Sequence, residues 1–472
     1  MLGVNVDKID TLKYIRQLRS ILLWILQGAR GTIVAATGFG KTFLAFIAIV
    51  KMNKLRPGSK TIVIVPTQVL STQWKKQIKK LKLPNVEVYV VNTIALNNTV
   101  YRCDLLVVDE IHMMAAPQFS RIFDLVRYKW ILGLTATIER LDGKHKQLQK
   151  YAPVTDCITQ LEAIKRGWIS DYIEVNVPVP MLRREIEGLE NLDRQIRFYM
   201  SKFGDFNVMR NCMSFENAKT YAQMHYPYED STTKASEIVK WAVQGQRHIK
   251  KRQEFLYKTE RKVETAVELF TEFDLKTIMF SQSTQFADDV VEKLGSVAVT
   301  YHSNIKSQVR NATKEKIYKT KPAAEKFQRT KDKAKIEEST GMYTVTWKEP
   351  KVFGVKSLKE EAVKLFNDQR SKVKVISTAK ALDQGFDVAD IELGIDSSRT
   401  SNPTQHIQRT GRVARNFTYK DGTKKRGVYI NLYVPNSRDE GWLRACQKNN
   451  PERIIWVDTV DDCKKLVKDL LK

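Results

Sequence analysis

Residues 32–50 read TIVAATGFGKTFLAFIAIV, an apolar strand followed by a glycine-containing turn and an apolar helix. This order is typical of a phosphate-binding loop, because the first N–H groups of the helix and the positive end of its dipole face an anion held in the turn. Gly38 and Gly40 allow the backbone to curl so that successive amides point inward. The alternative is a glycine-containing turn in another kind of α/β protein, but the Gly-Lys-Thr that joins strand to helix favours the phosphate loop.

The side chains after the turn suit a bound polyphosphate. Lys41 can reach the β- and γ-phosphates, and the Thr42 hydroxyl can ligate a magnesium ion. The strict template has Gly where this chain has Ala35, a residue small enough to leave the geometry open. The candidate nucleotide-binding residues of the loop are Thr37, Gly38, Phe39, Gly40, Lys41 and Thr42.

Strands and helices alternate in both halves of the chain. Helices are expected at 9–28 and 70–81, next to apolar, β-branched runs that predict buried strands. These strands are expected at 60–65, 86–91, 104–108, 130–134, 276–280, 297–301, 373–376 and 391–394. The alternation predicts an α/β fold with parallel sheets covered by helices on both faces. We expect two such domains in tandem, residues 1–155 and 156–472.

The composition indicates an anionic partner. The 472 residues include 79 Lys and Arg against 53 Asp and Glu, a formal net charge of +26, and the pI is about 9.6. Long nucleic acid is the commonest partner of such a charge. A membrane surface is the weaker alternative, since no basic amphipathic anchor is evident. Another alternative is that the charged side chains serve only to keep the protein surface solvated.

The cysteines indicate a reducing compartment. The five cysteines form neither a CxxC pair nor a Cys/His cluster, so neither a zinc site nor a disulfide framework is expected. Basic residues before the apolar run 21–26 imitate a signal peptide, but that run is only six residues long. We therefore expect a cytoplasmic or nucleoid-associated protein that is not secreted.

Polar residues follow the predicted strands at the ends where ligands gather in parallel sheets. Thr67, Thr93 and Thr135 occupy such positions, and Asp109-Glu110 follows four apolar residues. Asp109 is placed to support a magnesium ion, and Glu110 to orient and deprotonate a water that attacks the γ-phosphate. A helix N-cap with a first-turn charge is the alternative for this acidic pair.

Two segments interrupt the alternation. Residues 182–258 have a polar, helical periodicity, and the basic end of this excursion is either a nucleic-acid face or a solvated one. That end contains Arg247, Lys250, Lys251, Arg252, Lys258, Arg261 and Lys262. Residues 305–358 hold 14 Lys/Arg and 6 Asp/Glu, a net charge of +8 (14 minus 6). We expect a lysine-rich helical part and a hairpin of 342–346 and 352–355 around Glu349-Pro350; a disordered charged loop is the alternative.

Residues 405–415, QHIQRTGRVAR, place Arg412 and Arg415 on one helical face. Such arginines can reach across a cleft and stabilise charge on a transferred phosphoryl group. The alternative is an ordinary phosphate-contacting or ion-paired helix face.

Taken together, the motifs resemble those of superfamily 2 helicases, in the same order along nearly the whole chain. Residues 35–42 resemble the first motif in its AxxGxGKT form, and 109–112, DEIH, resemble a DExH box. Residues 408–415 are similar to motif VI, and Thr378-Ala379 with 385–387 are similar to motif V. Gln17 resembles the adenine-reading glutamine, although its surroundings match loosely.

The resemblance implies two RecA-like domains with ATP and Mg²⁺ between them. It also implies roles for residues that the pattern alone does not assign. From the second domain, Gln408, Arg412 and Arg415 would act on ATP, and Gly385 and Asp387 would adjoin the nucleotide. The nucleic-acid backbone would be held by Thr67, Thr93, Ser281, His302 and Thr378.

Within the superfamily, WILGLTAT at 130–137 and the layout are most similar to the XPB and phage UvsW-like group. That likeness implies DNA rather than RNA as the partner, 3′-to-5′ tracking, and remodelling of forks or branched duplexes. An RNA-directed DExH ATPase and an ATP-switched binding scaffold without strand displacement are the alternatives.

Overall fold

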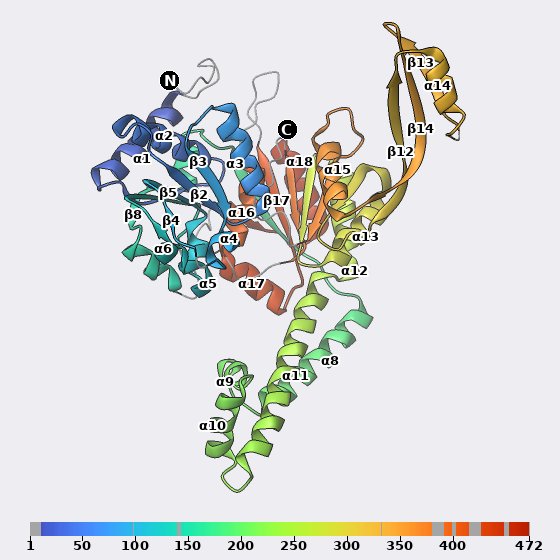
Figure 1. Ribbon diagram of the computed structural model, residues 1–472. Coiled ribbons are helices and arrows are strands. Elements are labelled where there is room, and N and C mark those ends of the chain that lie inside the picture. Colours follow the sequence, from blue (N-terminus) through green and yellow to red (C-terminus); the bar gives the residue numbers. More distant parts are fainter. Residues whose placement is uncertain are drawn as a thin grey trace.

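The computed structural model describes residues 11–97, 99–138, 143–331, 333–379, 391–398, 403–414, 426–447 and 453–471. It contains two large parallel sheets, each covered by helices, and two extensions that project from the second sheet's domain (Figure 1). The two sheets confirm the predicted α/β fold. No helix among the described residues has the length and apolar character needed to cross a bilayer.

The first sheet has the order β3-β2-β5-β7-β1-β8, and all its strands are parallel. In that order the strands are Val86–Val90, Thr61–Val65, Leu105–Asp109, Trp130–Thr135, Arg30–Ala35 and Val154–Ile158. Val63 and Val65 pack on one face, against α1 (Thr11–Leu26), α2 (Lys41–Leu55) and α3 (Gln68–Lys80). Ile62 and Ile64 pack on the other, against α4 (Val91–Ala95) and α6 (Ile122–Leu125). Burial on both faces explains the continuously apolar strand sequences.

The second sheet has the order β11-β15-β10-β16-β17-β9-β18, again parallel. Its strands in that order are Ala298–Tyr301, Val375–Ala379, Thr277–Ser281, Leu393–Asp396, Gly427–Tyr433, Tyr172–Pro178 and Ile454–Trp456. One face is covered by α12 (Glu260–Phe273), α13 (Thr284–Leu294) and α18 (Val460–Leu471), and the other by α15 (Val355–Asn367) and α16 (Pro403–Val413). The proposed boundary after residue 155 falls inside β8, and after α7 (Gln160–Lys165) the chain joins the second sheet at Tyr172.

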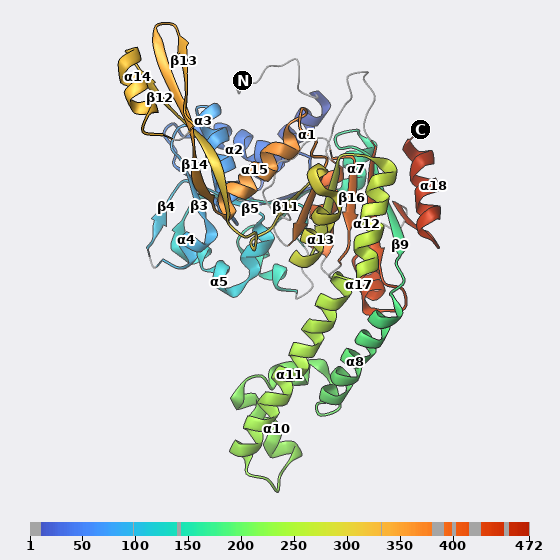
Figure 2. The same cartoon turned by 90° about the vertical axis from the view of Figure 1, so that its right-hand side faces the viewer.

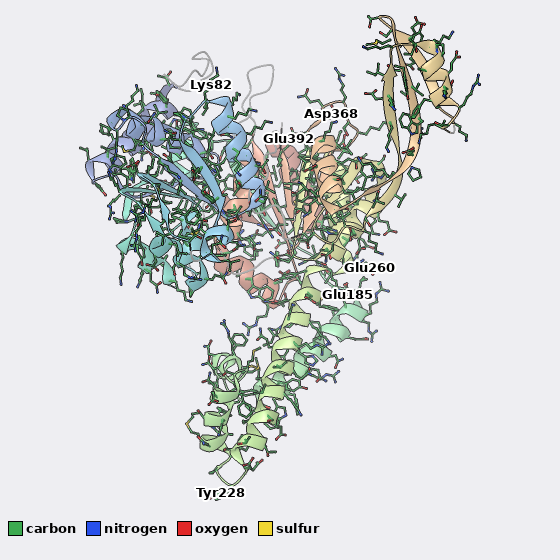
Figure 3. All side chains as sticks on the ribbon, in the orientation of Figure 1. Lys82, Glu185, Tyr228, Glu260, Asp368 and Glu392 are labelled. Carbon is green, nitrogen blue, oxygen red and sulfur yellow. The ribbon has the colours of Figure 1, made fainter. Side chains whose placement is uncertain are left out.

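The segment predicted as a helical excursion forms an arm. Its helices are α8 (Arg183–Met200), α9 (Phe206–Asn211), α10 (Phe215–His225) and α11 (Ser231–Tyr257). The arm extends away from both sheets, with Tyr228 at its far tip and Glu185 and Glu260 at its root (Figure 3). Glu185 fixes that root, because its carboxylate accepts hydrogen bonds from Leu182 N and Glu260 N at 2.9 and 2.8 Å.

The basic insertion is folded, but not as we expected. β12 (Gln308–Tyr318), β14 (Met342–Phe353) and β13 (Lys335–Ser339) form an antiparallel sheet in that order, with α14 (Lys321–Gln328) on one face. The helical prediction holds only for α14, since much of the lysine-rich part is β12.

The expected hairpin around Glu349-Pro350 is wrong. Pro350 lies within β14, opposite Asn311 of β12. β13 pairs only with an earlier part of β14, so on that side no hydrogen bond between strands is lost through the missing N–H of Pro350. The turn is at Thr340-Gly341, where both residues have positive φ (50° and 74°), as a two-residue hairpin turn requires.

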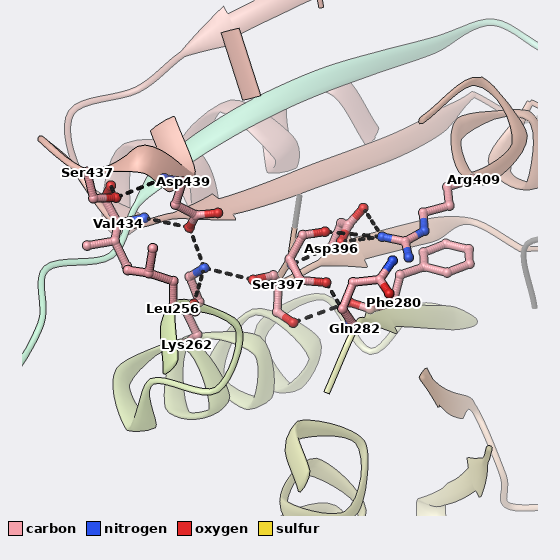
Figure 4. Close-up of polar contacts among 11 residues, drawn as sticks. Leu256, Lys262, Phe280, Gln282, Asp396, Ser397, Arg409, Val434, Ser437 and Asp439 are labelled. Carbon is pink, nitrogen blue, oxygen red and sulfur yellow. Dashed lines mark hydrogen bonds and ion pairs between the residues drawn. The ribbon is translucent and has the colours of Figure 1, made fainter. Parts of the chain in front are cut away.

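A buried ion pair joins the root of the arm to the second sheet (Figure 4). Lys262 and Asp439 are both 0% exposed, and Lys262 Nζ lies 2.5 Å from Asp439 Oδ2. Lys262 Nζ also donates to Leu256 O at the end of α11 and to Ser397 O just after β16, at 2.9 and 2.7 Å. Lys262 is therefore neither a nucleic-acid contact nor a solvated residue, contrary to both interpretations of the basic end.

We predict that Lys262→Met lowers the free energy of unfolding by about 3–5 kcal/mol, because it leaves Asp439 buried without its cation. Lys262→Met/Asp439→Leu should recover most of that loss, since no buried charge remains. The control is Arg261→Met, which removes a partly exposed cation that pairs with Glu264 and should cost less than about 1 kcal/mol. Urea unfolding measures all three, and equal losses for Lys262→Met and Arg261→Met would contradict the role of the pair.

Candidate functional site between the two domains

The phosphate loop has the backbone that its sequence predicts. Gly38 and Gly40 have φ values of +87° and +100°, in the region that favours glycine, and α2 begins at Lys41. The ring of Phe39 is fully buried and packs edge-on against Trp168, with ring centroids 5.4 Å apart. Phe39 can therefore serve the nucleotide site through its backbone, while its side chain anchors the loop to the core.

Gln17 lies directly against this loop. Its side chain is buried, and Nε2 donates to Phe39 O at 3.0 Å. A Cβ on residue 40 would lie 2.9 Å from Gln17 Nε2, so the contact depends on glycine there. The next side chain, Arg16, holds α1 in place through hydrogen bonds of 2.5 and 3.0 Å to the two carboxylate oxygens of Asp156.

Asp109 and Glu110 end β5 next to the loop. Glu110 has φ 50° and ψ 51°, a left-handed conformation that is uncommon outside glycine, and this turns it away from the strand direction. Glu110 Oε1 lies 3.7 Å from Lys41 Nζ, and Oε2 lies 3.4 Å from His112 Nδ1. The Asp109 carboxylate accepts hydrogen bonds from Trp74 Nε1 and Glu110 N, both at 3.1 Å.

The two adjacent carboxylates have opposite pKa shifts. Burial raises the pKa of Asp109, and the charge of Glu110 raises it further against the opposing charge of Lys41. Burial also opposes ionisation of Glu110, but Lys41, the His112 hydrogen bond and the charge of Arg412 outweigh it and lower its pKa. Of the two carboxylates, Glu110 is thus the one more strongly held in its ionised form, which a general base requires.

Arg412 reaches this site from the second domain, because α16 packs against the phosphate loop. A Cβ on Gly411 would lie 2.4 Å from Thr37 Cβ, so the helix backbone at Gly411 lies against the Thr37 side chain with no room for a side chain of its own. Gln408 is one helical turn before Arg412 on the same helix, and both are 7% exposed.

His112 connects the acidic pair to β7. Its Nδ1 lies 2.9 Å from Thr135 Oγ1, which also lies 3.4 Å from Glu110 Oε2. The Thr135 hydroxyl donates to Thr137 O at 2.6 Å and accepts from Thr137 N at 3.2 Å. Polar contacts therefore connect Glu110 to the loop that follows β7 through the side chains of His112 and Thr135.

The residues here fit a magnesium ion. Thr42 and Asp109 supply a hydroxyl and a carboxylate, the oxygen donors that Mg²⁺ binds together with phosphates and water. Burial first and the charge of Glu110 second raise the pKa of Asp109, against the opposing charge of Lys41. A divalent cation beside Asp109 would lower that pKa.

Comparisons with known proteins agree with this geometry. Residues 9–99 and 82–140 match the family described as type III restriction enzyme, res subunit, and residues 354–417 match the helicase conserved C-terminal domain. The DNA 3′-5′ translocase XPB2 of Sulfurisphaera tokodaii is 25% identical, over 87% of this chain and 79% of its own length. The DNA 3′-5′ helicase XPB of Mycobacterium tuberculosis is 27% identical over 34% of this chain and 33% of its own length. The chain is a superfamily 2 helicase, close to the XPB group.

A solved structure supports the fold of this helicase. S. cerevisiae Dbp5 bound to RNA and ADP BeF3 has a TM-score of 0.56 at 14% identity, over 100% of this chain and 98% of that chain. The family and the site together make the protein an ATP-dependent nucleic-acid helicase.

The residues expected to hold nucleic acid differ in exposure. In the first domain Thr93 is exposed on α4, and Thr67 caps α3 by accepting from Leu70 N at 3.4 Å. In the second domain Ser281, His302 and Thr378 are at most 2% exposed. His302 Nε2 lies 2.9 Å from Asp288 Oδ1, so its ring is bound within the helicase itself. Their role in holding a strand stays a prediction.

Three expected site residues are not among those that the structure describes, and one buried ion pair on α16 was not predicted. Arg415, Gly385 and Asp387 lie outside the described residues. Sequence reasoning did not single out Arg409, whose guanidinium donates to both oxygens of Asp396 at 3.0 and 2.9 Å (Figure 4). The sequence feature that could have pointed to this pair is Asp396, an acidic residue just after a predicted strand, as Asp109 is.

We predict that Gly411→Ala lowers the kcat of ATP hydrolysis roughly 100-fold, because displacing α16 by about 1 Å moves Arg412 out of position. Nucleotide binding to the first domain should persist, as measured with a fluorescent ATP analogue. The control is Gly441→Ala, where an added Cβ meets nothing within 4 Å. Equal kcat values for the two variants would contradict the close contact of α16 with the loop.

Proposed function

We propose that the helicase is DNA-directed, and that it unwinds or remodels forked or branched duplexes as ATP drives its two domains together. The observation that carries this proposal is the contact of α16 with the phosphate loop at Thr37, which places the charge of Arg412 from the second domain near enough to lower the pKa of Glu110 in the first. Hydrolysis then depends on the relative position of the domains, which is how a motor couples a chemical step to movement.

The roles follow from the contacts of each side chain. Lys41 and the amides of the loop bind the phosphates, and ionised Glu110 accepts a proton from the attacking water. Arg412 stabilises the negative charge that develops on the γ-phosphate, from a position that only the closed arrangement provides. A magnesium ion held by Thr42 and Asp109 would neutralise charge on the β- and γ-phosphates.

DNA is the favoured partner because two relatives, which match 87% and 34% of this chain, are described as DNA 3′-5′ translocase and DNA 3′-5′ helicase. We assign the same 3′-to-5′ direction. Of the candidate strand contacts, Thr67 and Thr93 of the first domain are accessible, and contacts from their hydroxyls to a phosphate backbone imply weak sequence preference and strong salt dependence. An intracellular location, cytoplasmic or nucleoid-associated, follows from the same proposal.

Glu110→Gln should keep ATP and nucleic-acid binding but lower turnover about 10²- to 10⁴-fold, because the base is lost while the shape is kept. The control is Glu87→Gln at a half-exposed carboxylate on β3, which should leave turnover unchanged. Steady-state ATPase assays compare the two. Retained hydrolysis in Glu110→Gln would remove Glu110 from the role of base.

The choice between DNA and RNA is tested with matched substrates. We expect ATPase activity to be stimulated more by a forked DNA than by an RNA fork of the same sequence, with ATP-dependent strand displacement on the DNA. Stronger stimulation by RNA would favour the RNA-directed alternative. ATP-dependent binding without displacement of either strand would favour the scaffold.

A further inference from the structure

The excess positive charge of the insertion between β11 and α15 lies on one side of its sheet. Within its sheet, Val345 and Trp347 point to the face that α14 covers, where they form a small core with Ala324. Side chains alternate along a strand, and directly paired residues share a face. The register therefore assigns each charged residue of the sheet to the α14 side or to the opposite side.

The α14 side is strongly basic. Its charged residues are the cations Arg310, Lys314, Lys316, Lys321, Lys326, Arg329, Lys331 and Lys351 and the anions Glu325, Glu338 and Glu349. The opposite face is balanced, with Lys335 and Lys348 against Glu315 and Glu337. A charge that served only solvation would not need to lie on one side.

Aromatic rings hold two of these lysines in place. Lys316 Nζ lies 4.9 Å from the ring centroid of Phe327, and Lys331 Nζ lies 5.4 Å from that of Trp347. Phe327 on α14 and Trp347 of the sheet belong to the insertion's core, so these rings are engaged by the protein rather than available for stacking with bases. Lys314 and Lys331 donate to Glu349, and Arg310 donates to Glu361. The other cations of this side, among them Lys321 and Lys326, offer ammonium and guanidinium groups, which suit phosphates.

The length of the insertion suits a duplex. β14 has 12 residues, which at about 3.3 Å per residue extend about 40 Å. That length exceeds one helical turn of B-form DNA, about 34 Å. A basic surface of this length can contact successive phosphates along one side of a duplex.

The insertion is also rooted where a nucleic acid is expected. It leaves the second sheet at the carboxyl end of β11, next to β15 and Thr378. Arg310 braces its base by donating to both carboxylate oxygens of Glu361 on α15, at 2.9 Å each. Figures 1 and 2 both show the insertion and the helical arm extending in different directions from the second domain.

We propose that the α14 side of the insertion binds the phosphate backbone of duplex nucleic acid, beside the strand that the two domains hold. The proposal rests on the proposed function, that of a motor that works at junctions of duplex and single strand. Neither matched family covers residues 308–353. The proposal gives these residues the function of holding the duplex part of the nucleic-acid substrate in place.

The test compares two double variants with the same change of charge. Lys321→Glu/Lys326→Glu alters the basic side, and Lys335→Glu/Lys348→Glu alters the opposite face; all four residues are exposed, so both variants should fold. The probe is a blunt DNA duplex of two helical turns, with a single strand of the same length for comparison. Binding is measured over a series of salt concentrations, and thermal melting checks the fold.

The first variant should bind the duplex at least tenfold more weakly and reduce the slope of log K against log salt by about 2, since each lost phosphate contact contributes about 0.9. The opposite-face variant should keep the wild-type slope, and single-strand binding should change little in either. Equal duplex affinities and slopes for the two variants overturn the inference while leaving the motor intact. Wild-type protein that binds neither probe overturns the proposed function as well.

Discussion

The contact between α16 and the phosphate loop is the constraint on which the rest of the structure depends. Gly411 touches Thr37 with no space for a side chain, and three residues later Ala414 packs in the core of the first domain. Ser170 N donates to Ala414 O at 2.9 Å, which ties the same segment to the connection between the sheets. A helix of the second domain is thus part of the first domain's site, and Arg412 is positioned by packing.

Electrostatics also links the two domains here. The pKa of Glu110 is lowered chiefly by Lys41 and His112 of its own domain, and the charge of Arg412 from the second domain adds the smallest contribution. α16 is itself held by the Arg409–Asp396 pair, and Asp396 also accepts a hydrogen bond from Tyr429 OH at 2.8 Å. The next residue, Ser397, accepts from buried Lys262 at the root of the arm. Arm, helix and site are therefore connected through buried polar contacts.

The sequence was informative where local chemistry determines the structure. The phosphate loop and the strands follow from residues that are adjacent in the chain, because a strand buried on both faces must be apolar throughout. Gly38, Gly40 and the acidic pair at the end of β5 were placed correctly for the same reason. The helical spacing of Arg412 and Arg415 left a role across a cleft as one of two alternatives, and the family motifs favoured that role.

The predictions were wrong where residues far apart in the chain determine the structure. Lys262 was assigned to a basic face because its partner Asp439 is 177 positions away, although Lys262 shares an apolar stripe of α12 with Ala266 and Leu269. The insertion was misread because Pro350 looked like a turn, whereas the pairing of β14 with a single neighbour at that point tolerates proline. The true turn uses Thr340 at positive φ, where a β-branched residue is uncommon.

The central claim is that one nucleotide is held by both domains at once. The most direct measurement is a crystal structure of the protein with a non-hydrolysable ATP analogue, Mg²⁺ and a DNA strand. We predict that the γ-phosphate contacts Lys41 from the first domain and Arg412 from the second. A nucleotide bound to the loop with Arg412 directed elsewhere, and no second-domain residue in contact with it, would contradict this account.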